Sequence, residues 1–267
     1  MTEIKKTLTI LKARWPEVVL IIGVNLLAIL SSRFIAKFGS KSIRTIAYVV
    51  PLVSLLFSVI RMLLRCGFLR TTYLENSRRQ TPLALLRTGT HFFWRMFVIS
   101  LIYSLPFMLL SLVFTWSVYN YFGCDKMTSS HIIFWFSTLF FVFVNLVLIK
   151  LILLIPALII VLDCSVFNSF RLFRRYKLSN AKELVFLYLA NIAIGLLWSG
   201  LSFYSWGGTC STMQSQYALR IVVLLITSFI NLMIAVMAVR FVASKNLVYD
   251  NQPAEDLSKR TDGNLKE

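Results

Sequence analysis

The chain has 267 residues, of which 58% are hydrophobic and only 15% are charged, and its mean hydropathy is +0.75. Because a soluble domain carries about 25% charged residues, this composition excludes an ordinary soluble fold. The net charge of +17 would suit nucleic acid, but the cations flank long apolar segments and form no separate basic module. We therefore expect anionic lipids, and not nucleic acid, as their partners.

The N-terminal segment predicts a helix that lies along the inner membrane interface. Ile4, Leu8, Leu11 and Trp15 recur on one helical face within residues 3–15. A cleaved signal peptide is the alternative. We disfavour it because no small-x-small cleavage site follows the apolar run.

Two transmembrane spans are predicted next, because about 20 apolar residues cross the hydrocarbon core of a bilayer. The first span covers about residues 17–32 and the second about residues 46–64. Arg61 stands near the end of the second span, where its long side chain can snorkel to the headgroups. Four cations lie in the loop between these spans, so the first two spans are the least regular part of the predicted topology.

An amphipathic segment, residues 81–95, precedes the third span at about residues 96–119. Thr81 is suited to cap this helix and Pro82 to occupy its first position. We expect the helix to lie at the cytoplasmic interface, although packing against the bundle is an equally open alternative. The basic stripe that would contact the headgroups consists of Arg87, His91 and Arg95.

The fourth predicted span, about residues 132–162, is interrupted by Lys150. Lys150 lies 12 residues before Leu162, about 18 Å along a helix, which is too far for easy snorkelling. We expect its ammonium to face the bundle interior. Binding of an anion or proton and a purely structural hydrogen bond are both open. The polar side chains predicted as its partners are Asn145, Asn191, Asn231 and Tyr103.

A second amphipathic segment, residues 165–178, precedes the last two spans at about residues 184–204 and 221–239. The order span, interfacial helix, span thus occurs twice and indicates an internal pseudo-repeat. Residues 1–248 would form one integral membrane domain, and residues 249–267 read as a disordered tail. The second set of headgroup contacts is Arg171, Arg174 and Arg175.

The cysteines fall in two pairs of equivalent places. Cys66 and Cys164 end two spans on the predicted cytoplasmic side, where we expect packing as small apolar groups. Cys124 and Cys210 fall in the two predicted outer loops that follow the third and fifth spans. A disulfide between them is a hypothesis, and two unpaired thiols are the alternative.

The distribution of positive charge predicts the orientation. With both termini cytoplasmic, 21 of the 28 Lys and Arg residues fall on the inner side and six on the outer side, with Lys150 inside a span. Short loops rich in Lys and Arg stay in the cytoplasm during insertion. The chain is therefore predicted to be a multi-pass protein of a cytoplasmic (inner) membrane.

Two stretches carry a resemblance to a known family. Residues 67–110 begin GFLRTTYLENSRRQTPLALLRTGTHFFWRMF, and residues 153–189 read LLIPALIIVLDCSVFNSFRLFRRYKLSNAKELVFLYL. They resemble a mostly uncharacterised prokaryotic group of six-span integral membrane proteins, related to the membrane domain attached to some glycerophosphoryl diester phosphodiesterases. The shared pattern is an intramembrane proline, a loop acid and a basic interfacial helix, here Pro156, Asp163 and the segment around Arg171. The resemblance implies the fold; the catalytic barrel of the phosphodiesterases has no counterpart here.

The residues that catalysis needs are largely missing from the sequence. It has no paired carboxylates at catalytic spacing, no HExxH helix, no glycine-rich phosphate loop and no G-x-S-x-G elbow. We expect an all-α six-span bundle with no enzymatic role, no cofactor and no metal, which associates with lipids, protein partners or a second copy. The alternative is a small transporter or permease for an anionic or lipid-like substrate that uses Lys150.

Overall fold

The computed structural model describes residues 2–38, 43–74, 80–122, 126–176, 181–204 and 211–250. Within these ranges nearly every residue is helical and none belongs to a strand, which confirms the predicted all-α class. The helices are α1 (Glu3–Ala13), α2 (Trp15–Phe38), α3 (Ile43–Tyr73), α4 (Pro82–Phe122), α5 (Lys126–Val147), α6 (Ile149–Leu162), α7 (Val166–Leu172), the short 3-10 helix η2 (Phe173–Arg175), α8 (Lys182–Tyr204) and α9 (Ser211–Asp250).

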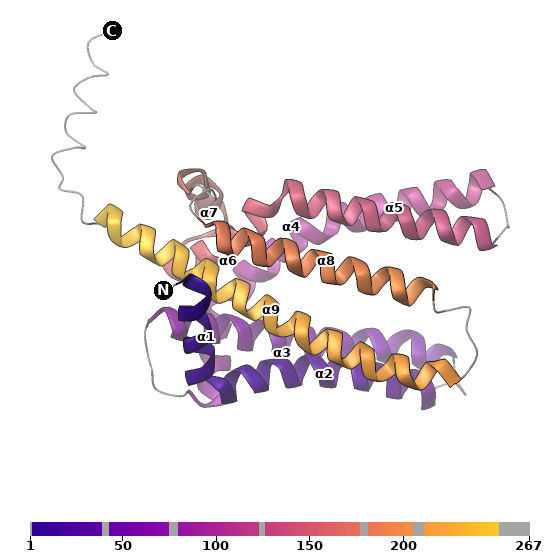
Figure 1. Ribbon diagram of the computed structural model, residues 1–267, viewed down its shortest axis with the longest axis horizontal. Helices are drawn as coiled ribbons and strands as arrows, with labels where there is room; N and C mark the ends of the chain where they lie inside the picture. The colour runs from indigo at the N-terminus through magenta and orange to yellow at the C-terminus, as the bar shows by residue number, and fades with distance from the viewer. Residues whose placement is uncertain are drawn as a thin grey trace, which may run out of the picture.

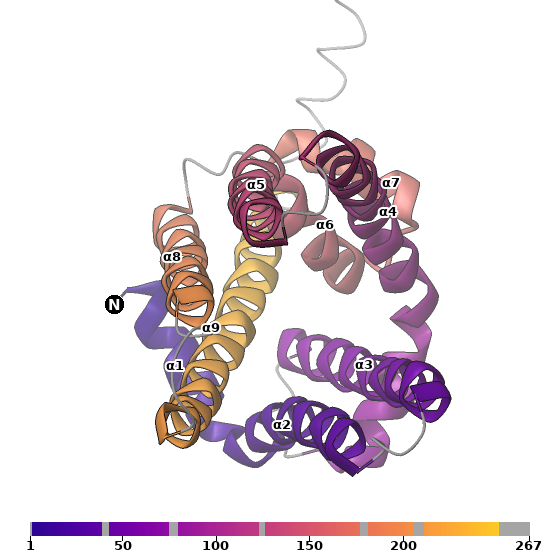
Figure 2. The same cartoon turned by 90° about the vertical axis from the view of Figure 1, so that its right-hand side faces the viewer.

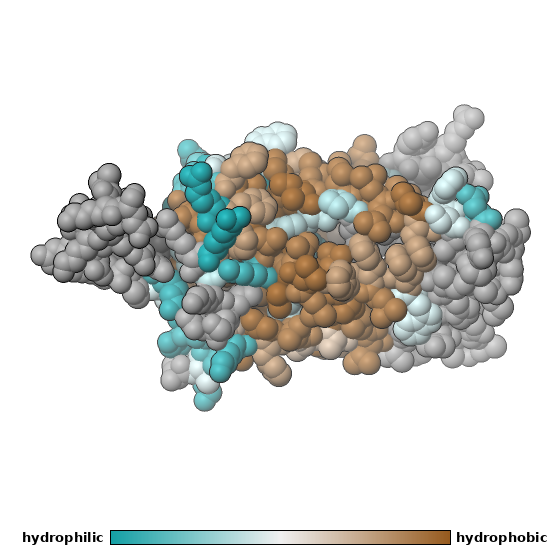
Figure 3. Space-filling view, turned by 90° about the horizontal axis from the view of Figure 1, so that it is seen from above, coloured by the Kyte–Doolittle hydropathy of each residue, from teal (hydrophilic) through white to brown (hydrophobic). Residues whose placement is uncertain are grey.

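Three of the described helical segments are long and apolar enough to cross a membrane: Pro51–Tyr73, Pro82–Phe114 and Ile221–Lys245. A fourth arises if Thr138–Val147 and Ile149–Leu162, which meet at an angle of 58°, count as one bent span. The space-filling view shows a broad hydrophobic region across the middle of the visible face and hydrophilic side chains gathered chiefly toward one end (Figure 3). This distribution is typical of a protein embedded in a bilayer.

Helices α2, α3, α4, α5, α8 and α9 run roughly along the long axis of the molecule (Figure 1). Seen end-on, they form a ring with α6 on its inner side (Figure 2). Helices α1 and α7 and the last turns of α9 lie together at one end of the bundle, which we call the α7 end. The first turns of α9 and the last turns of α2 lie toward the opposite end.

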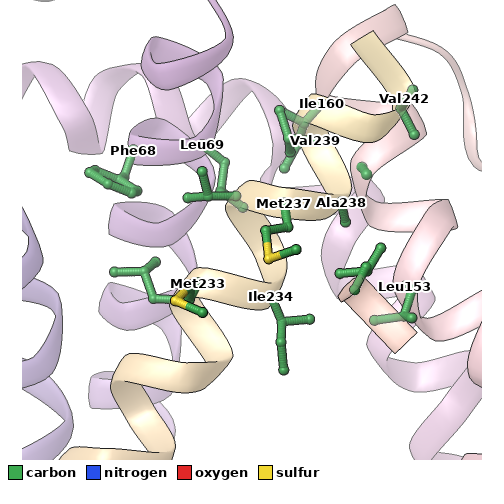
Figure 4. Packing of buried hydrophobic residues seen from close by; sticks show 14 of the residues in the cluster. Phe68, Leu69, Leu153, Ile160, Met233, Ile234, Met237, Ala238, Val239 and Val242 are labelled. Atoms are coloured by element: carbon green, nitrogen blue, oxygen red, sulfur yellow. The ribbon is translucent and has the colours of Figure 1, made fainter. Parts of the chain in front are cut away.

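The buried core lies toward the α7 end, where α6 packs between α3 and α9 (Figure 4). Eight residues of α6 are buried, because this helix is apolar on every side and is surrounded by other helices. Phe68 and Leu69 of α3 and Met233 and Met237 of α9 belong to the same buried cluster. Burying one such side chain contributes about 1.5–3 kcal/mol, so this region supplies much of the packing energy.

Two glycines allow α3 and α4 to approach closely. A Cβ atom at Gly67 would lie 2.0 Å from the carbonyl oxygen of Leu85, and one at Gly89 would lie 2.0 Å from that of Leu63. Both distances are far below van der Waals contact, so no side chain fits at either glycine without separating the helices. The pairs Gly67–Leu85 and Leu63–Gly89 also set the register of these two antiparallel helices. In that register, Arg61 of α3 lies at about the height of His91 on α4.

The predicted interfacial helix of residues 81–95 is not a separate element. It is the first part of α4, which continues through Arg95 to Phe122 without a break. Thr81 caps this helix as expected, since its side-chain oxygen accepts a hydrogen bond from the Ala84 amide at 3.3 Å. No glycine or proline stands near Arg95 to end the helix, and the segment therefore fuses with the span that follows.

The second amphipathic segment behaves differently. Ser165 caps α7 by accepting a hydrogen bond from the Asn168 amide, and α7 ends at Leu172 in a turn of 3-10 helix before α8 begins at Lys182. One segment is therefore continuous with its span and the other is separate, so the described helices do not form two matching copies.

The predicted span 132–162 is also not one straight helix. α5 ends at Val147 and α6 begins at Ile149, with a bend of 58° between them. The bend directs α6 toward the inner side of the ring, where it packs against α9. Pro156 lies inside α6 and does not interrupt it.

Candidate ligand-binding cavity

A partly open cavity of about 1320 Å³ lies between the helices and is lined by α2, α3, α4, α5, α6, α8 and α9. Ordinary small-molecule pockets measure about 300–1,000 Å³, so this cavity can hold a larger ligand. Most of its wall is aliphatic, from residues such as Leu30, Leu55 and Ile221. A cavity of this size between membrane helices is a candidate binding site.

Two arginines of α3 line the cavity. Arg61 and Arg65 are four residues apart and therefore share one helical face. Arg61 Nη1 donates a hydrogen bond to Asn25 Oδ1 at 3.0 Å, and Arg65 Nη2 donates to the carbonyl oxygen of Asn231 at 3.4 Å. Among the residues that the structure describes, those that line the cavity include no Asp or Glu. The cavity therefore presents two positive charges without a carboxylate beside them.

Amide side chains extend this polar lining from helix to helix. Asn25 of α2, which accepts the Arg61 bond but is not itself among the lining residues, donates to the Ser228 hydroxyl of α9 at 3.3 Å. Asn191 of α8 donates to Asn231 Oδ1 of α9 at 3.2 Å. The Tyr188 hydroxyl of α8 donates to Asn145 Oδ1 of α5 at 2.6 Å. These bonds connect α2, α9, α8 and α5 around the cavity.

Two buried polar atoms in the wall have no hydrogen-bond partner within the described part of the chain. They are the hydroxyl oxygen of Tyr103 and Oδ1 of Asn191, and both residues line the cavity. An unpaired buried polar group costs about 1–3 kcal/mol, and such groups in native proteins usually serve a purpose. Both atoms can contribute hydrogen bonds to a polar ligand.

The charge in the cavity is distributed unevenly along its length. Arg61 lies at about the height of His91, whose exposed side chain binds the exposed Asp163 on the outer surface. The arginines therefore lie at a height where the protein surface is polar. Toward the opposite end the wall continues with Leu55 of α3 and Leu30 of α2. The cavity thus has a cationic part at its α7 end and a more apolar part deeper in the belt.

Lys150 does not join the asparagines that were expected as its partners. Its ammonium lies over the ring of Phe173, 5.0 Å from the ring centroid, and Lys150 is not among the cavity-lining residues. Asn145, Asn191 and Asn231 do line the cavity. The bend before α6 explains the difference, because it turns the start of α6 away from the line of α5. Tyr103 also lines the cavity.

The predicted headgroup contacts separate into two groups. Arg87, Arg171 and Arg174 have exposed side chains, whereas the side chain of Arg175 lies outside the described part. His91 and Arg95 instead bind an acid of the protein itself.

Asp163 receives both of those bonds. His91 Nε2 lies 3.0 Å from its Oδ1, and Arg95 Nη1 donates a very short hydrogen bond to the same oxygen. Partial burial raises the pKa of Asp163, but the hydrogen bonds from Arg95 and His91 together outweigh it, so the pKa lies below its ordinary value. Asp163 also has a φ of 50°, in the left-handed region that Asp tolerates better than most residues. The ion pairs therefore anchor the end of α6 to α4.

A buried ion pair stabilises the junction between α1 and α2. Arg14 pairs with Glu17, and both side chains are only 3% exposed. Arg14 also donates hydrogen bonds to the hydroxyls of Thr71 and Thr72 on α3, and Glu17 accepts one from the Gln80 amide at 2.9 Å. This cluster joins α1 and α2 to the last turn of α3 and the start of α4, and its role is structural.

The remaining predictions concern cysteines and metals. Cys124 and Cys210 lie outside the described residues. Cys66 is buried in a hydrophobic cluster and Cys164 packs at its edge. Partial burial is the main cause that raises the pKa of the Cys164 thiol. Among the residues that the structure describes, no group of three or more His, Cys, Asp or Glu side chains could hold a metal ion.

The sequence analysis did not identify the two arginines of the cavity wall. It interpreted Arg61 as a snorkelling side chain and gave no role to Arg65 or Asn25. The available signal was the spacing of Arg61 and Arg65 by four residues within an apolar helix, together with a single asparagine in the first span.

Comparisons of the chain with protein-family models, with curated proteins and with solved structures found no match. The resemblance to the six-span group described above therefore stays a prediction.

Proposed function

We propose that this chain is a non-enzymatic, six-span protein of a cytoplasmic membrane that binds an anionic, lipid-like amphiphile in its central cavity. The observation that carries the proposal is the pair Arg61 and Arg65, which line an otherwise mostly apolar cavity; none of the described residues in its wall is an acid. The arginines would bind the anionic headgroup, and the aliphatic wall would contact the hydrocarbon part of the ligand.

The proposed spans are α2, α3, α4, the bent pair of α5 and α6, α8 and α9. Three of these, or four with the bent pair, meet the length and hydropathy expected for a membrane helix. An even number of spans agrees with the position of α1 and the last turns of α9 at the same end of the bundle (Figure 1). We propose that this α7 end faces the cytoplasm, because most cations of the chain flank it.

Exposed aromatic side chains support a membrane surface near the α7 end. Trp94 of α4 is 69% exposed and Phe167 of α7 is 86% exposed. Trp94 directly precedes Arg95, and Phe167 follows Asp163 by four residues, so the Arg95–Asp163 bond holds both rings near one height. Trp and other aromatic residues gather at the membrane interface. Arg61 and Arg65 would then lie close to the headgroup layer, where a lipid phosphate also lies.

The chemistry of the site favours a phosphate or carboxylate on the ligand. A guanidinium offers a planar set of N–H donors that matches both groups. Two arginines one turn apart repel each other in a medium of low dielectric constant, and an anion between them would relieve that repulsion. Lys150 has no part in this site.

Transport is a second candidate function, and the cavity is the observation that favours it. Transporter sites form between helices inside the membrane, and this cavity is lined by seven helices. A transporter built on this cavity would use Arg61 and Arg65 in the role first predicted for Lys150.

The test compares two double variants, each of which removes two positive charges. Arg61→Gln with Arg65→Gln alters the cavity, whereas Arg87→Gln with Arg174→Gln alters exposed surface arginines. Each protein is reconstituted in phosphatidylcholine nanodiscs that contain a minority of phosphatidylglycerol, then transferred to detergent, and retained lipid is counted by native mass spectrometry. We expect the wild type and the surface variant to retain phosphatidylglycerol and the cavity variant to lose most of it.

Equal retention by all three proteins would overturn the proposal. Addition of inorganic phosphate during the transfer separates the two sources of a phosphate group. If the ligand is a lipid, free phosphate leaves the retained phosphatidylglycerol unchanged, and if the site prefers a soluble anion, phosphate displaces the lipid.

A further inference from the structure

We propose that the ligand is a membrane lipid that reaches the cavity sideways from the bilayer, through the seam between α5 and α8. This inference rests on the proposed function, because it assigns an access route and a source to the ligand of the same cavity.

The ring of helices is packed unevenly. Helices α9 and α2, α2 and α3, α3 and α4, α4 and α5, and α8 and α9 each approach one another over several residues. Within the described part of the chain, α5 and α8 are neighbours in the ring without such packing (Figure 2). A helix pair that lacks close backbone packing separates at a lower cost than one that interlocks along its length.

The cavity reaches this seam from inside. Thr138 and Asn145 of α5 and Tyr188 and Ile192 of α8 are part of its wall. The Tyr188–Asn145 hydrogen bond of 2.6 Å crosses the seam. A single hydrogen bond contributes about 0.5–1.5 kcal/mol, so thermal motion can open such a contact and let it close again.

The outer faces of α5 and α8 are suited to lipid. Phe143 and Leu146 of α5 are 63% and 47% exposed, and Phe186 and Leu197 of α8 are each 70% exposed. Apolar side chains of this size meet acyl chains in a bilayer. A lipid molecule at the seam can therefore move its chains between two apolar environments, and only its headgroup changes surroundings.

Among the residues that the structure describes, those at the α7 end leave no comparable opening. There α6 and α9 pack against α3 in the buried core, and Leu154, Leu158 and Val236 have no exposed surface (Figure 4). A soluble anion from the cytoplasm would have to pass this core, whereas a lipid would not.

The test closes the seam chemically. Asn145→Cys and Tyr188→Cys are introduced together after the four native cysteines are replaced by alanine, and a short bismaleimide joins the two new thiols. The protein is stripped of lipid in detergent and then placed in phosphatidylcholine nanodiscs with a minority of isotope-labelled phosphatidylglycerol. Native mass spectrometry follows the uptake of labelled lipid, with the same variant without linker as the matched control.

If the seam is the route, cross-linking before lipid is added slows loading at least tenfold, and cross-linking after loading traps the labelled lipid against exchange. Equal rates with and without the linker would overturn the lateral route. A wild type that takes up no phosphatidylglycerol would instead overturn the proposed function, so the two failures differ.

A second variant covers the case in which the double cysteine protein does not load even without linker. Gly195 of α8 lines the cavity near the seam, and a Cβ atom placed there meets nothing within 4 Å. Gly195→Phe therefore fills space without a backbone clash. We expect it to slow loading severalfold, while Gly23→Phe, which also has open space around its Cβ but lies away from the cavity wall, keeps the wild-type rate. Equal rates in both variants would contradict the lateral route.

Discussion

The two parts of the bundle differ in how tightly their contacts fix them. At the α7 end, aliphatic side chains of α6 and α9 are fully buried, and the Arg14–Glu17 pair is surrounded by hydroxyl and amide partners. Around the cavity, hydrogen bonds between uncharged side chains, such as Tyr188–Asn145 and Asn191–Asn231, join the helices. The α7 end therefore stabilises the fold, whereas the region around the cavity has space for a ligand.

The largest effect should come from breaking the buried ion pair. Glu17→Gln leaves the Arg14 guanidinium buried without its counter-charge, which costs about 3–5 kcal/mol. We expect a large loss of thermal stability in detergent, measured by circular dichroism. Replacement of both partners, Arg14→Met with Glu17→Leu, should recover part of that loss. A Glu17→Gln variant as stable as the wild type would show that this ion pair does not anchor the junction of α1 and α2.

The next effect concerns the contact of α3 with α4. Gly89→Ala places a methyl group against the Leu63 carbonyl oxygen, so the helices must separate, at a cost of about 1–3 kcal/mol. Gly23→Ala, where the added methyl meets nothing within 4 Å, is the matched control and should be neutral or slightly stabilising. If both variants unfold at the same temperature, α3 and α4 do not approach as closely at Gly89 as the structure shows.

The cavity arginines should matter much less for stability. In lipid-free protein, Arg61→Gln with Arg65→Gln relieves about 0.2–0.5 kcal/mol of like-charge repulsion but also removes the hydrogen bonds to Asn25 and Asn231, so we expect little net change in stability. The same change should reduce affinity for phosphatidylglycerol about tenfold or more, equal to about 1.4 kcal/mol. Unfolding temperature and lipid titration are measured on one preparation. A marked loss of stability would assign the arginines to the structural part of the bundle.

The smallest effect is electrostatic and depends on pH. The lowered pKa of Asp163 means that its ion pairs stabilise the fold at neutral pH and lose this contribution as the pH falls through the folded-state pKa, below the ordinary value of 3.8. Asp163→Asn keeps a residue that tolerates the left-handed conformation and removes the charge. Since the carboxylate is 40% exposed, we expect a loss of about 0.2–1 kcal/mol at neutral pH.

The difference between Asp163→Asn and wild type should shrink as the pH approaches and passes below that folded-state pKa. Thermal melts at neutral and acid pH would measure it, and a difference that is constant with pH would contradict the assignment.

The sequence predicted the helical class, the N-cap at Thr81 and the approximate positions of the apolar helices, because these depend on local composition. It did not predict the continuity of α4 through Arg95 or the bend before Lys150, because helix ends inside apolar runs depend on tertiary packing. Asn145, Asn191 and Asn231 were expected to gather inside the bundle and do line the cavity. Lys150 was expected beside them, but its ammonium lies over the Phe173 ring, and the cations that line the cavity are Arg61 and Arg65.

The most direct measurement of the central claim is the dipolar coupling between lipid phosphorus and arginine side-chain nitrogen, measured by solid-state NMR. The protein is labelled with nitrogen-15 in its arginines and embedded in phosphatidylcholine bilayers with a minority of phosphatidylglycerol. We predict a strong coupling that disappears in Arg61→Gln with Arg65→Gln and persists in Arg87→Gln with Arg174→Gln. A spectrum in which the cavity variant keeps the full wild-type coupling would contradict lipid binding by these two arginines.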